Sequence, residues 1–415
     1  MIVTISGYSY GLAFDPFNLG GRVWRPRVAG LVMLGWLFAG TTGWAARPDA
    51  VPGTARKALV VAHYAELMQA EYDDTLALAG ELQTNIERLL AQPSGEHLAA
   101  ARTAWIHCRT PYSQSEVGRF YGGPIDGIEG YINAWPIDEN YLDYTVGMPD
   151  VGIINEARAF PVISSEVLLG ANEREGAKTV STGFHAIEFL LWGQDLYGDG
   201  PGRREYTDYV DGATGPGRTA ARRRQYLHLL AELLVNQLRT VDLEWAPNNP
   251  HNYRARLLAQ DPDAALTAII TGLGNLGSAE LYGERLLVPY TTRSQENEES
   301  CFSDTTHLDL LNNELGFQNI CEGGYQRVDG TRLSGPGLLA LLEPKEPRLA
   351  KALRARVAAA VVAVRAIPAP FDQAMLGRDQ DRGRVAIKQA LGALQAQTAA
   401  LVQAGDQLGL QVNLK

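Results

Sequence analysis

The most informative stretch of this chain is Gly183-Phe184-His185-Ala186-Ile187-Glu188-Phe189-Leu190-Leu191-Trp192-Gly193. It is an apolar run with helical character that carries one histidine and one glutamate. Ionisable groups cannot be buried among apolar neighbours without a partner. Residues three apart lie on one face of a helix, with Cβ atoms about 5–6 Å apart. The sequence therefore predicts that His185 and Glu188 bind one metal ion together.

The His-x-x-Glu spacing is weak when taken alone. Seven histidines and 47 acidic residues among 415 give about 0.8 His-x-x-acid pairs by chance. The alternative is a hydrogen bond between the two side chains on a helix surface. The apolar setting favours the metal site.

Helical periodicity continues on both sides of this run. Helices are expected at residues 55–92, 94–109, 182–192, 218–245, 262–287, 305–314, 337–342, 347–367 and 382–408. Strand-like alternation is almost absent. The sequence therefore predicts an all-α protein of two packed, four-helix-type bundles.

Breaks in the periodicity divide the chain. Residues 111–172 are rich in glycine and proline but also in aromatic residues, so we expect a long ordered loop region there. We assign residues 46–245 to an N-terminal bundle with the His-x-x-Glu motif and residues 246–415 to a C-terminal bundle. The basic triplet at 222–224 is expected to form a solvent-exposed helix face.

The N-terminus has the features of an export signal. Arginines at positions 22, 25 and 27 precede an apolar run of about 13 residues, followed by small residues that end at Ala45. A membrane-spanning helix needs about 20 residues. We expect residues 1–45 to be a signal peptide with an N-terminal extension, and the mature chain to have no transmembrane segment.

Charge and cysteine content exclude several classes of function. The net charge of −10 argues against a nucleic-acid partner and favours a cation. Of the three cysteines, Cys301 and Cys321 form the favoured bridge, which would stabilise the fold by about 3 kcal/mol. Three buried thiols, including Cys108, are the alternative. No CxxC pair is present, which argues against a cysteine-based zinc or redox site.

Three further motifs accompany the central run. They are residues 105–122 with Ser115-Glu116, residues 135–144 with Trp135-Pro-Ile-Asp138, and residues 299–309. With Gly183-x-His185-x-x-Glu188 they resemble the imelysin-like family, also called the insulin-cleaving membrane protease family, and in particular its iron-regulated periplasmic subgroup. The resemblance covers most of residues 55–415. It implies two helical bundles with a site near their junction, a periplasmic or outer-membrane location, and a link to iron acquisition.

The resemblance also implies site residues. His185 and Glu188 match the GxHxxE signature directly. Glu116 lies where related metal-binding members place an acid, so it is the next predicted ligand. Arg109 is expected either to orient Glu116 or to form an ordinary surface ion pair.

Two aspartates match the family pattern more loosely. Asp126 and Asp138 are further candidate ligands. The alternatives are a turn role for Asp126 beside Gly127 and a helix-cap role for Asp138 after Pro136.

The segment 295–309 concentrates potential ligands, which are Glu296, Glu298, Glu299, Asp304, His307 and Asp309. Ser303 or Asp304 fits the N-cap of a helix that carries His307, and for Ser303 the capping role is favoured. If this loop faces His185, His307 would complete the metal site. Arg285 is expected to pair with these acids or to bind an anion that accompanies the metal.

Three functions compete. The first is an exported protein that binds a metal ion or metal chelate for iron uptake, with a membrane transport partner; imidazole with carboxylates favours iron, with zinc or copper as alternatives. The second is a zinc-dependent metallopeptidase. The third is a surface-interaction module whose polar cluster only fixes helix packing. The sequence has no HExxH motif, nucleophile elbow or phosphate-binding GxxxxGK[ST] loop, which leaves the metal site as the best-supported chemistry. It has many carboxylates but no recognisable substrate-binding strand edge, so we expect binding without turnover.

Overall fold

The computed structural model describes residues 53–212 and 218–414. The predicted signal peptide at residues 1–45 lies outside these ranges. All described residues belong to one compact unit, Pro48–Lys415. None of the helices in the described ranges combines the length and the hydropathy that a membrane crossing requires.

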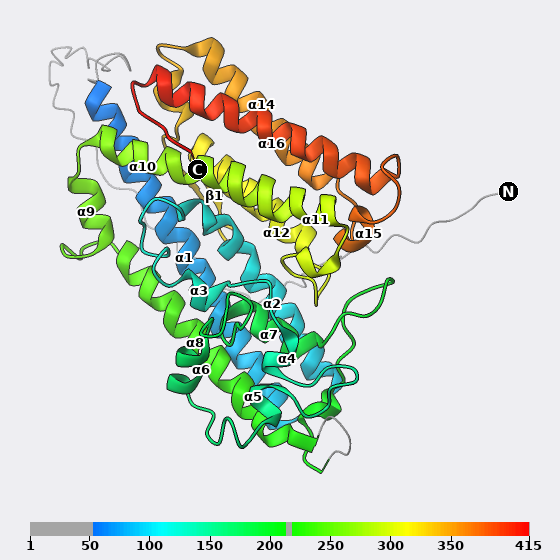
Figure 1. Cartoon of the computed structure of the whole chain (residues 1–415). Coiled ribbons are helices and arrows are strands. Elements are labelled where there is room, and N and C mark those ends of the chain that lie inside the picture. Colours follow the sequence, from blue (N-terminus) through cyan, green and yellow to red (C-terminus); the bar gives the residue numbers. More distant parts are fainter. Residues whose placement is uncertain (1–52, 213–217, 415) are drawn as a thin grey trace, which may run out of the picture. The chain divides into compact units, whose positions relative to one another are not determined.

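Helices dominate the described chain (Figure 1). Up to residue 259 they are α1 (Gly53–Ala91), α2 (Gly95–Ser115), η2 (Glu116–Gly118), α3 (Glu129–Ile132), α4 (Glu139–Leu142), α5 (Gly152–Asn155), α6 (Ser165–Ala171), α7 (Gly183–Trp192), η3 (Tyr206–Tyr209), α8 (Ala220–Trp245) and α9 (Tyr253–Ala259). Beyond it they are α10 (Pro262–Asn275), η5 (Leu276–Leu287), α11 (Val288–Thr292), η6 (Gln295–Asn297), α12 (Thr306–Glu322), α13 (Leu339–Leu342), α14 (Pro347–Arg365), α15 (Phe371–Met375) and α16 (Arg382–Gln407).

The all-α prediction is confirmed. Within the described ranges, strand structure amounts to one antiparallel pair, β1 (Gly324–Gln326) and β2 (Arg332–Ser334), and one isolated bridge. Most predicted helices are present. The predicted end of the second helix at residue 109 is wrong, because α2 continues through Pro111 to Ser115 while burying Tyr112 completely.

Local signals explain where several helices begin and end. Ser94 accepts a hydrogen bond from the backbone N–H of His97 (3.1 Å) and so caps α2. Asp261 caps α10, with Pro262 in the first turn. Gly323 ends α12 in the left-handed conformation, with φ +75°.

The long helices form two groups that share contacts (Figure 1). In the first group, α1 packs along α2 and α8, and α7 packs against α2 and α8. In the second, α14 packs along α16, while α12 packs on α14 and η5 packs on α16. Helix α12 also packs on α2, and α1 packs on α10, so the groups are joined. The division into two bundles near residue 245, where α8 ends, stays a prediction.

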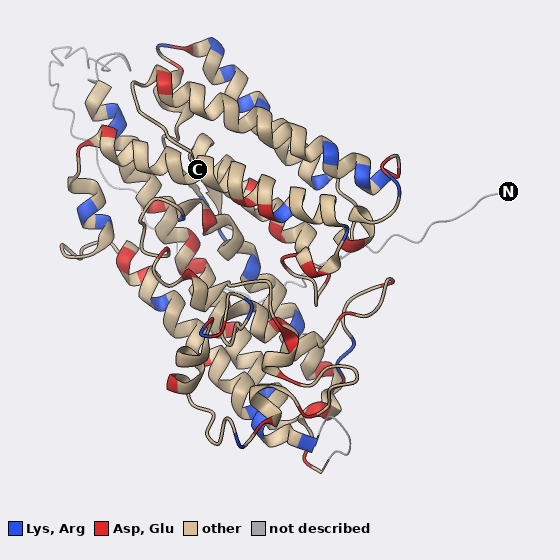
Figure 2. Cartoon of the chain, in the orientation of Figure 1, with Lys and Arg blue, Asp and Glu red and all other residues tan. Residues whose placement is uncertain are grey.

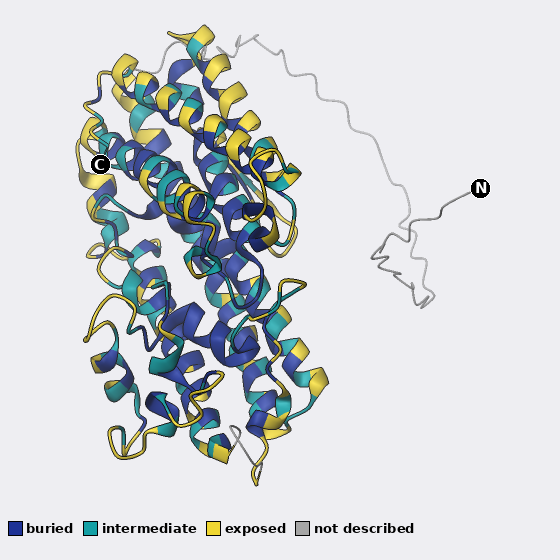
Figure 3. Ribbon diagram, turned by 45° about the vertical axis from the view of Figure 1, so that its right-hand side comes forward, coloured by how far each residue is buried: buried dark blue, intermediate teal, exposed yellow. Residues whose placement is uncertain are grey.

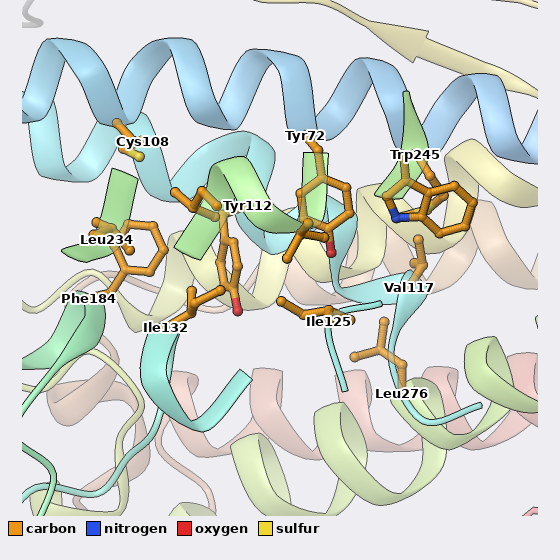
Figure 4. Packing of buried hydrophobic residues seen from close by; sticks show 14 of the residues in the cluster. Tyr72, Cys108, Tyr112, Val117, Ile125, Ile132, Phe184, Leu234, Trp245 and Leu276 are labelled. Carbon is orange, nitrogen blue, oxygen red and sulfur yellow. The ribbon is translucent and has the colours of Figure 1, made fainter. Parts of the chain in front are cut away.

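Buried apolar residues run through both groups (Figure 3). Figure 4 shows side chains of the first group, such as Tyr112 and Phe184, in the same cluster as Leu276, with which η5 begins. Because this cluster is continuous, the apolar core extends across the contact between the groups.

Helix η5 is a π-helix between α10 and α11. In a π-helix, hydrogen bonds connect residues five apart, and such segments are frequent at functional sites. Glu280 and Arg285 are five apart and lie together, with Arg285 Nη2 donating to Glu280 Oε1 (3.0 Å). Figure 2 shows acidic and basic residues next to one another on this helix. The π-helix therefore places a charged pair on one face.

The loop region is ordered by buried ion pairs. Asp143 accepts two hydrogen bonds of 2.7 Å from Arg223 and one of 2.8 Å from Arg204. Arg223 is fully buried, so the expectation of a solvated basic triplet is wrong for this residue. The reason is that Asp143 supplies the partner that a buried guanidinium requires.

The three cysteines are free thiols. Cys108 and Cys321 are buried, and Cys301 is partly buried. The favoured Cys301–Cys321 bridge is therefore absent, and the alternative of unbridged thiols describes the structure.

Gly183 shows why the central motif begins with glycine. Its φ is +88°, and a Cβ at this position would lie 2.5 Å from the carbonyl oxygen of Ile132. A side chain here meets both a strained backbone conformation and a backbone clash.

We expect Gly183→Ala to lower the free energy of unfolding by about 2–3 kcal/mol. Chemical denaturation followed by circular dichroism measures this. Gly80→Ala is the matched control, because Gly80 lies in α1 with nothing within 4 Å of its Cβ position. That change should stabilise by about 0.5–1 kcal/mol. Equal effects at the two positions would contradict the account of Gly183.

Glu314 of α12 is buried, and its Oε2 accepts from Gln397 of α16 (3.1 Å). Burial raises the pKa of Glu314 to about 8, from 4.5. Since the folded state then holds a proton that the unfolded state releases, this group makes stability fall as pH rises from about 5 to about 8. Glu314→Gln should flatten that fall and stabilise the protein at pH 8. The exposed Glu322→Gln on the same helix should leave the profile unchanged in thermal unfolding.

Candidate functional site

Helix α7 holds His185 and Glu188 in the interior. They are 1% and 0% exposed, and His185 Nδ1 lies 2.7 Å from Glu188 Oε2. Trp105 of α2 fixes the helix, because its Nε1 donates to the Phe184 carbonyl (2.9 Å). The Trp105 ring meets the imidazole edge-on, with 6.4 Å between centroids. The pair is thus buried rather than solvent-facing, and its members bind each other.

The loop before α12 binds the second oxygen of Glu188. Ser303 donates its backbone N–H (2.9 Å) and its hydroxyl (2.7 Å) to Glu188 Oε1. The expectation that Ser303 or Asp304 caps the following helix is wrong, since α12 begins at Thr306 and its N-cap is Thr305. The Ser303 hydroxyl instead binds Glu188 of α7, which is distant in sequence. Both oxygens of Glu188 therefore have partners.

One polar atom of the pair is left open. His185 Nε2 is buried and has no hydrogen-bond partner in the described part of the chain. Leaving a buried polar atom unsatisfied costs about 1–3 kcal/mol. The charge of His185 acts on the carboxylate of Asp309 and lowers the pKa of Asp309. Nε2 of His185 is therefore available to bind a ligand, either through a hydrogen bond or through its lone pair.

Arg109 of α2 connects two acids of the loop and of α12. Its Nε donates to Asp309 Oδ1 (3.0 Å), and its Nη2 donates to Glu299 Oε1 (2.8 Å). Its Nη1 bonds to the side-chain oxygen of Asn133. The guanidinium lies 5.1 Å from the Phe184 ring centroid. Arg109 is thus buried and binds several side chains, so the alternative of a surface ion pair is wrong. Its charge also lowers the pKa of Glu116.

Arg285 of η5 holds Glu116 in a bidentate pair. Nη1 lies 2.7 Å from Oε2, and Nη2 lies 2.8 Å from Oε1. Arg119 adds a bond of 2.8 Å to Oε1, and Asn313 donates to Oε2 (2.7 Å). Burial acts to raise the pKa of Glu116, but Arg285 and Arg119 hold it well below its usual value. Glu116 is therefore ionised, and a ligand role for it stays a prediction that requires exchange of a guanidinium.

The buried polar network has more acids than bases. Its carboxylates are those of Glu116, Glu299 and Asp309, with the partly exposed Glu129 and Glu280 at its edge, and its guanidinium groups are those of Arg109, Arg119 and Arg285. Burial raises the pKa of Asp309 to about 6, although Arg109 acts in the opposite direction. An added cation would offset the excess of negative charge.

Asp126 and Asp138 take their alternative roles in the structure. Asp126 accepts hydrogen bonds from four backbone N–H groups, those of Phe120, Tyr121, Gly122 and Gly123. Asp138 caps α4 by accepting from Asn140 N (3.1 Å). Their use as ligands stays a prediction.

His307 lies in the first turn of α12 and is partly exposed. Burial lowers its pKa. Its Nδ1 has no hydrogen-bond partner in the described ranges. Its place in the His185 site also stays a prediction.

Sequence reasoning missed several network residues, namely Asn133, Asn313, Arg119 and Glu280. Arg119 had a local signal, because it lies three residues after Glu116. Glu280 had none, because a five-residue spacing places side chains together only in a π-helix. The two asparagines are polar groups whose burial only packing reveals.

A cleft of about 390 Å³ reaches the network from the surface. Its lining includes Arg119 and Asn133, which contact Glu116, and Glu280, which pairs with Arg119. The further acids Glu129 and Glu284 also line it. Negative charge on a cleft wall concentrates cations. In the described ranges no three His, Cys, Asp or Glu side chains form a group that could hold a metal ion.

Comparisons with known proteins agree with this architecture. A family model described as imelysin, peptidase M75, matches residues 68–401. The chain is 28% identical over 357 residues to the iron-regulated protein A of Synechococcus elongatus, covering 84% of this chain and 83% of that protein.

Two crystal structures share the fold. One, described as an iron-regulated protein A precursor from Parabacteroides distasonis, has a TM-score of 0.67 and 20% identity, covering 87% of this chain and 97% of that one. An imelysin-like protein from Psychrobacter arcticum has a TM-score of 0.61 and 16% identity, covering 88% and 98%.

We expect Arg285→Met to destabilise the protein by about 3–5 kcal/mol, because it leaves Glu116 buried without its main partner. The double variant Arg285→Met/Glu116→Gln should recover most of this loss. Unfolding in denaturant measures both. Arg354→Met is the control, since its pair with Glu343 is about half exposed on both sides and should contribute less than about 1 kcal/mol. Additive losses in the double variant would show that the pair is not coupled.

Proposed function

The chain belongs to the imelysin family, and from this premise we propose that it binds a metal ion, with iron favoured, at a centre built on His185, and serves iron uptake or handling. The observation that carries the proposal is the open, buried Nε2 of His185. The relative from Synechococcus is named for regulation by iron, which supports iron as the cargo.

The hydrogen bond between His185 and Glu188 indicates that the two side chains have different roles in metal binding. Metal-ligating histidines commonly donate their second ring N–H to a carboxylate, which fixes the tautomer and the ring orientation. Glu188 stands in that position, at 2.7 Å from Nδ1, and Ser303 holds its other oxygen. His185 Nε2 is then the metal donor, and Glu188 is a positioning residue. This differs from the sequence hypothesis that both side chains are ligands.

Carboxylates for the remaining ligand positions lie in the same network. The charge of His185 influences the carboxylate of Asp309. Arg109 donates hydrogen bonds to both Asp309 and Glu299. Both are engaged by Arg109, so a metal ion would have to replace guanidinium contacts. Because the network has an excess of carboxylates, such an exchange leaves no uncompensated positive charge. One imidazole with carboxylates favours iron, while zinc and copper are the competing metals.

The acidic cleft supplies an access route. Glu129 and Glu280 line it, and Asn133 connects it to Glu299 inside. A free ion or a small chelate would be attracted by its charge. A membrane transport partner, export by a signal peptide and a periplasmic or outer-membrane location are parts of the same proposal.

The competing function is peptide hydrolysis, which the peptidase label of the family favours. A metallopeptidase needs a metal-bound water beside a groove that positions an extended backbone. Here His185 and Glu188 are 1% and 0% exposed, and Glu188 has both oxygens occupied. We therefore favour binding without turnover.

We expect natively purified protein to carry a first-row metal, which His185→Ala abolishes and Glu188→Gln weakens by about 10–100-fold. Metal content by elemental analysis and affinity by competition with a chelator measure this. His228→Ala is the control, because His228 is a half-exposed histidine that pairs with Glu87.

Unfolded polypeptide substrates should remain intact with metal-loaded protein. Cleavage that is present in the wild type and lost in Glu188→Gln would replace the binding function by the peptidase function. Equal metal content in wild type and His185→Ala would remove the proposed centre.

A further inference from the structure

A pocket of about 380 Å³ lies at the C-terminal end of α7 and shares no lining residue with the acidic cleft. Its walls come from the segments 144–149 and 192–197, and from Arg203 and Arg204. The volume is within the range of about 300–1,000 Å³ that is usual for small-molecule sites. Among the described residues that line this pocket, two are arginines and none is acidic. Although the whole chain has a net charge of −10, this wall therefore favours an anion.

Arg204 is 7% exposed, and its guanidinium group is held by one nitrogen. Nη1 donates to Asp143 Oδ2 (2.8 Å) and to Asp208 Oδ2 (2.9 Å). Nε is buried and has no hydrogen-bond partner in the described part of the chain, and the hydrogen bonds of the group within that part all come from Nη1. Nε and Nη2 form an edge of the guanidinium that can bind a carboxylate through two parallel hydrogen bonds. This edge is available to a ligand in the pocket.

The surroundings of Arg204 hold this edge in place. The guanidinium carbon lies 5.1 Å from the ring centroid of Tyr144 and 5.4 Å from that of Phe189. The backbone N–H of Arg204 donates to the Trp192 carbonyl (2.7 Å). Gly193, which also lines the pocket, has a φ of +73°, and a Cβ there would lie 3.6 Å from Nε. Glycine at this position leaves the approach to Nε free of a side chain.

The rest of the pocket wall is aromatic or apolar. Tyr144, Trp192 and Tyr197 line it. Val146 and Leu196 also line it, and they are 76% and 58% exposed. Aromatic faces and exposed aliphatic side chains suit a flat apolar ligand, which removes their surface from water.

The positive charge that a ligand needs comes from Arg203. Asp143 and Asp208 do not line the pocket, and Arg204 and Arg223 balance their charges. Arg203 forms an ion pair in which the two side chains are 50% and 78% exposed. A pair of this kind contributes little to stability, so Arg203 can turn to a bound anion.

We infer that this pocket binds a small carboxylate with an aromatic body, separately from the His185 centre. The carboxylate accepts two hydrogen bonds from Nε and Nη2 of Arg204, and Arg203 balances its charge. The aromatic body lies against Tyr144, Trp192 and Tyr197. The ligand would satisfy a buried N–H group that otherwise has no acceptor, which is favourable in itself.

The experiment is a calorimetric titration of 2-naphthoate into the full mature chain in the presence of a metal chelator. We expect one equivalent to bind with a dissociation constant of about 1 mM or lower. Two further probes divide the ligand into its parts. Naphthalene-2-carboxamide has the same body without the charge, and acetate has the charge without the body. Each should bind at least about tenfold more weakly.

Variants test the assigned residues. Arg204→Lys keeps the positive charge but loses the two parallel donors, so 2-naphthoate should bind at least about tenfold more weakly. Leu196→Asp tests the same pocket without changing a buried ion pair, because Leu196 is 58% exposed. The added carboxylate should weaken binding at least about fivefold, whereas the neutral Leu196→Asn should stay within about threefold. Thermal unfolding of each variant shows that it is folded at the temperature of the titration.

Two controls separate this site from other effects. Leu243→Asp adds the same charge at a 56% exposed position of α8 and should bind 2-naphthoate as the wild type does. His185→Ala should keep the affinity within about twofold, so the result does not depend on the proposed metal centre. Absence of binding, equal binding of the carboxylate and the carboxamide, or equal affinities of Leu196→Asp and Leu196→Asn would overturn the inference.

Discussion

Buried ion pairs join α2 and the adjoining η2 to η5 and to α12 with the loop before it. Arg109 reaches from α2 to Asp309 and Glu299, and Arg285 reaches from η5 to Glu116. Apolar packing is non-directional and tolerates small displacements, whereas a bidentate guanidinium–carboxylate pair has one favourable geometry. These pairs therefore fix how the two helix groups meet, while the apolar cluster supplies the bulk of the stabilisation.

The geometry around His185 depends on this contact. Glu299 and Ser303 belong to the same loop, and Arg109 holds the loop at Glu299. With the loop fixed, Ser303 can clamp Glu188, and Glu188 can orient the imidazole. This chain of contacts explains why Nδ1 of His185 has a hydrogen-bond partner.

Two neighbouring groups of acids have different surroundings and hence different chemistry. Around Glu116 the carboxylates are largely compensated by arginines, so their pKa values are held low or only moderately raised. Around Glu298 no such partners are among the strongest influences, and the pKa values rise. The pKa of a buried carboxylate here therefore depends on whether an arginine reaches it.

The sequence by itself determined the all-α class, most helix positions, the family resemblance and the placement of His185 and Glu188 on one face of one helix. It could do so because helical periodicity and apolar composition around an ionisable pair are local properties. The tertiary structure alone decided that Glu188 positions His185, that Ser303 binds Glu188 instead of capping α12, and that Arg223 is buried against Asp143. It also brought Glu280 to Arg285 through a π-helix. The physical reason is that the partner of a buried charge is chosen by packing between segments distant in sequence, about which local spacing carries no information.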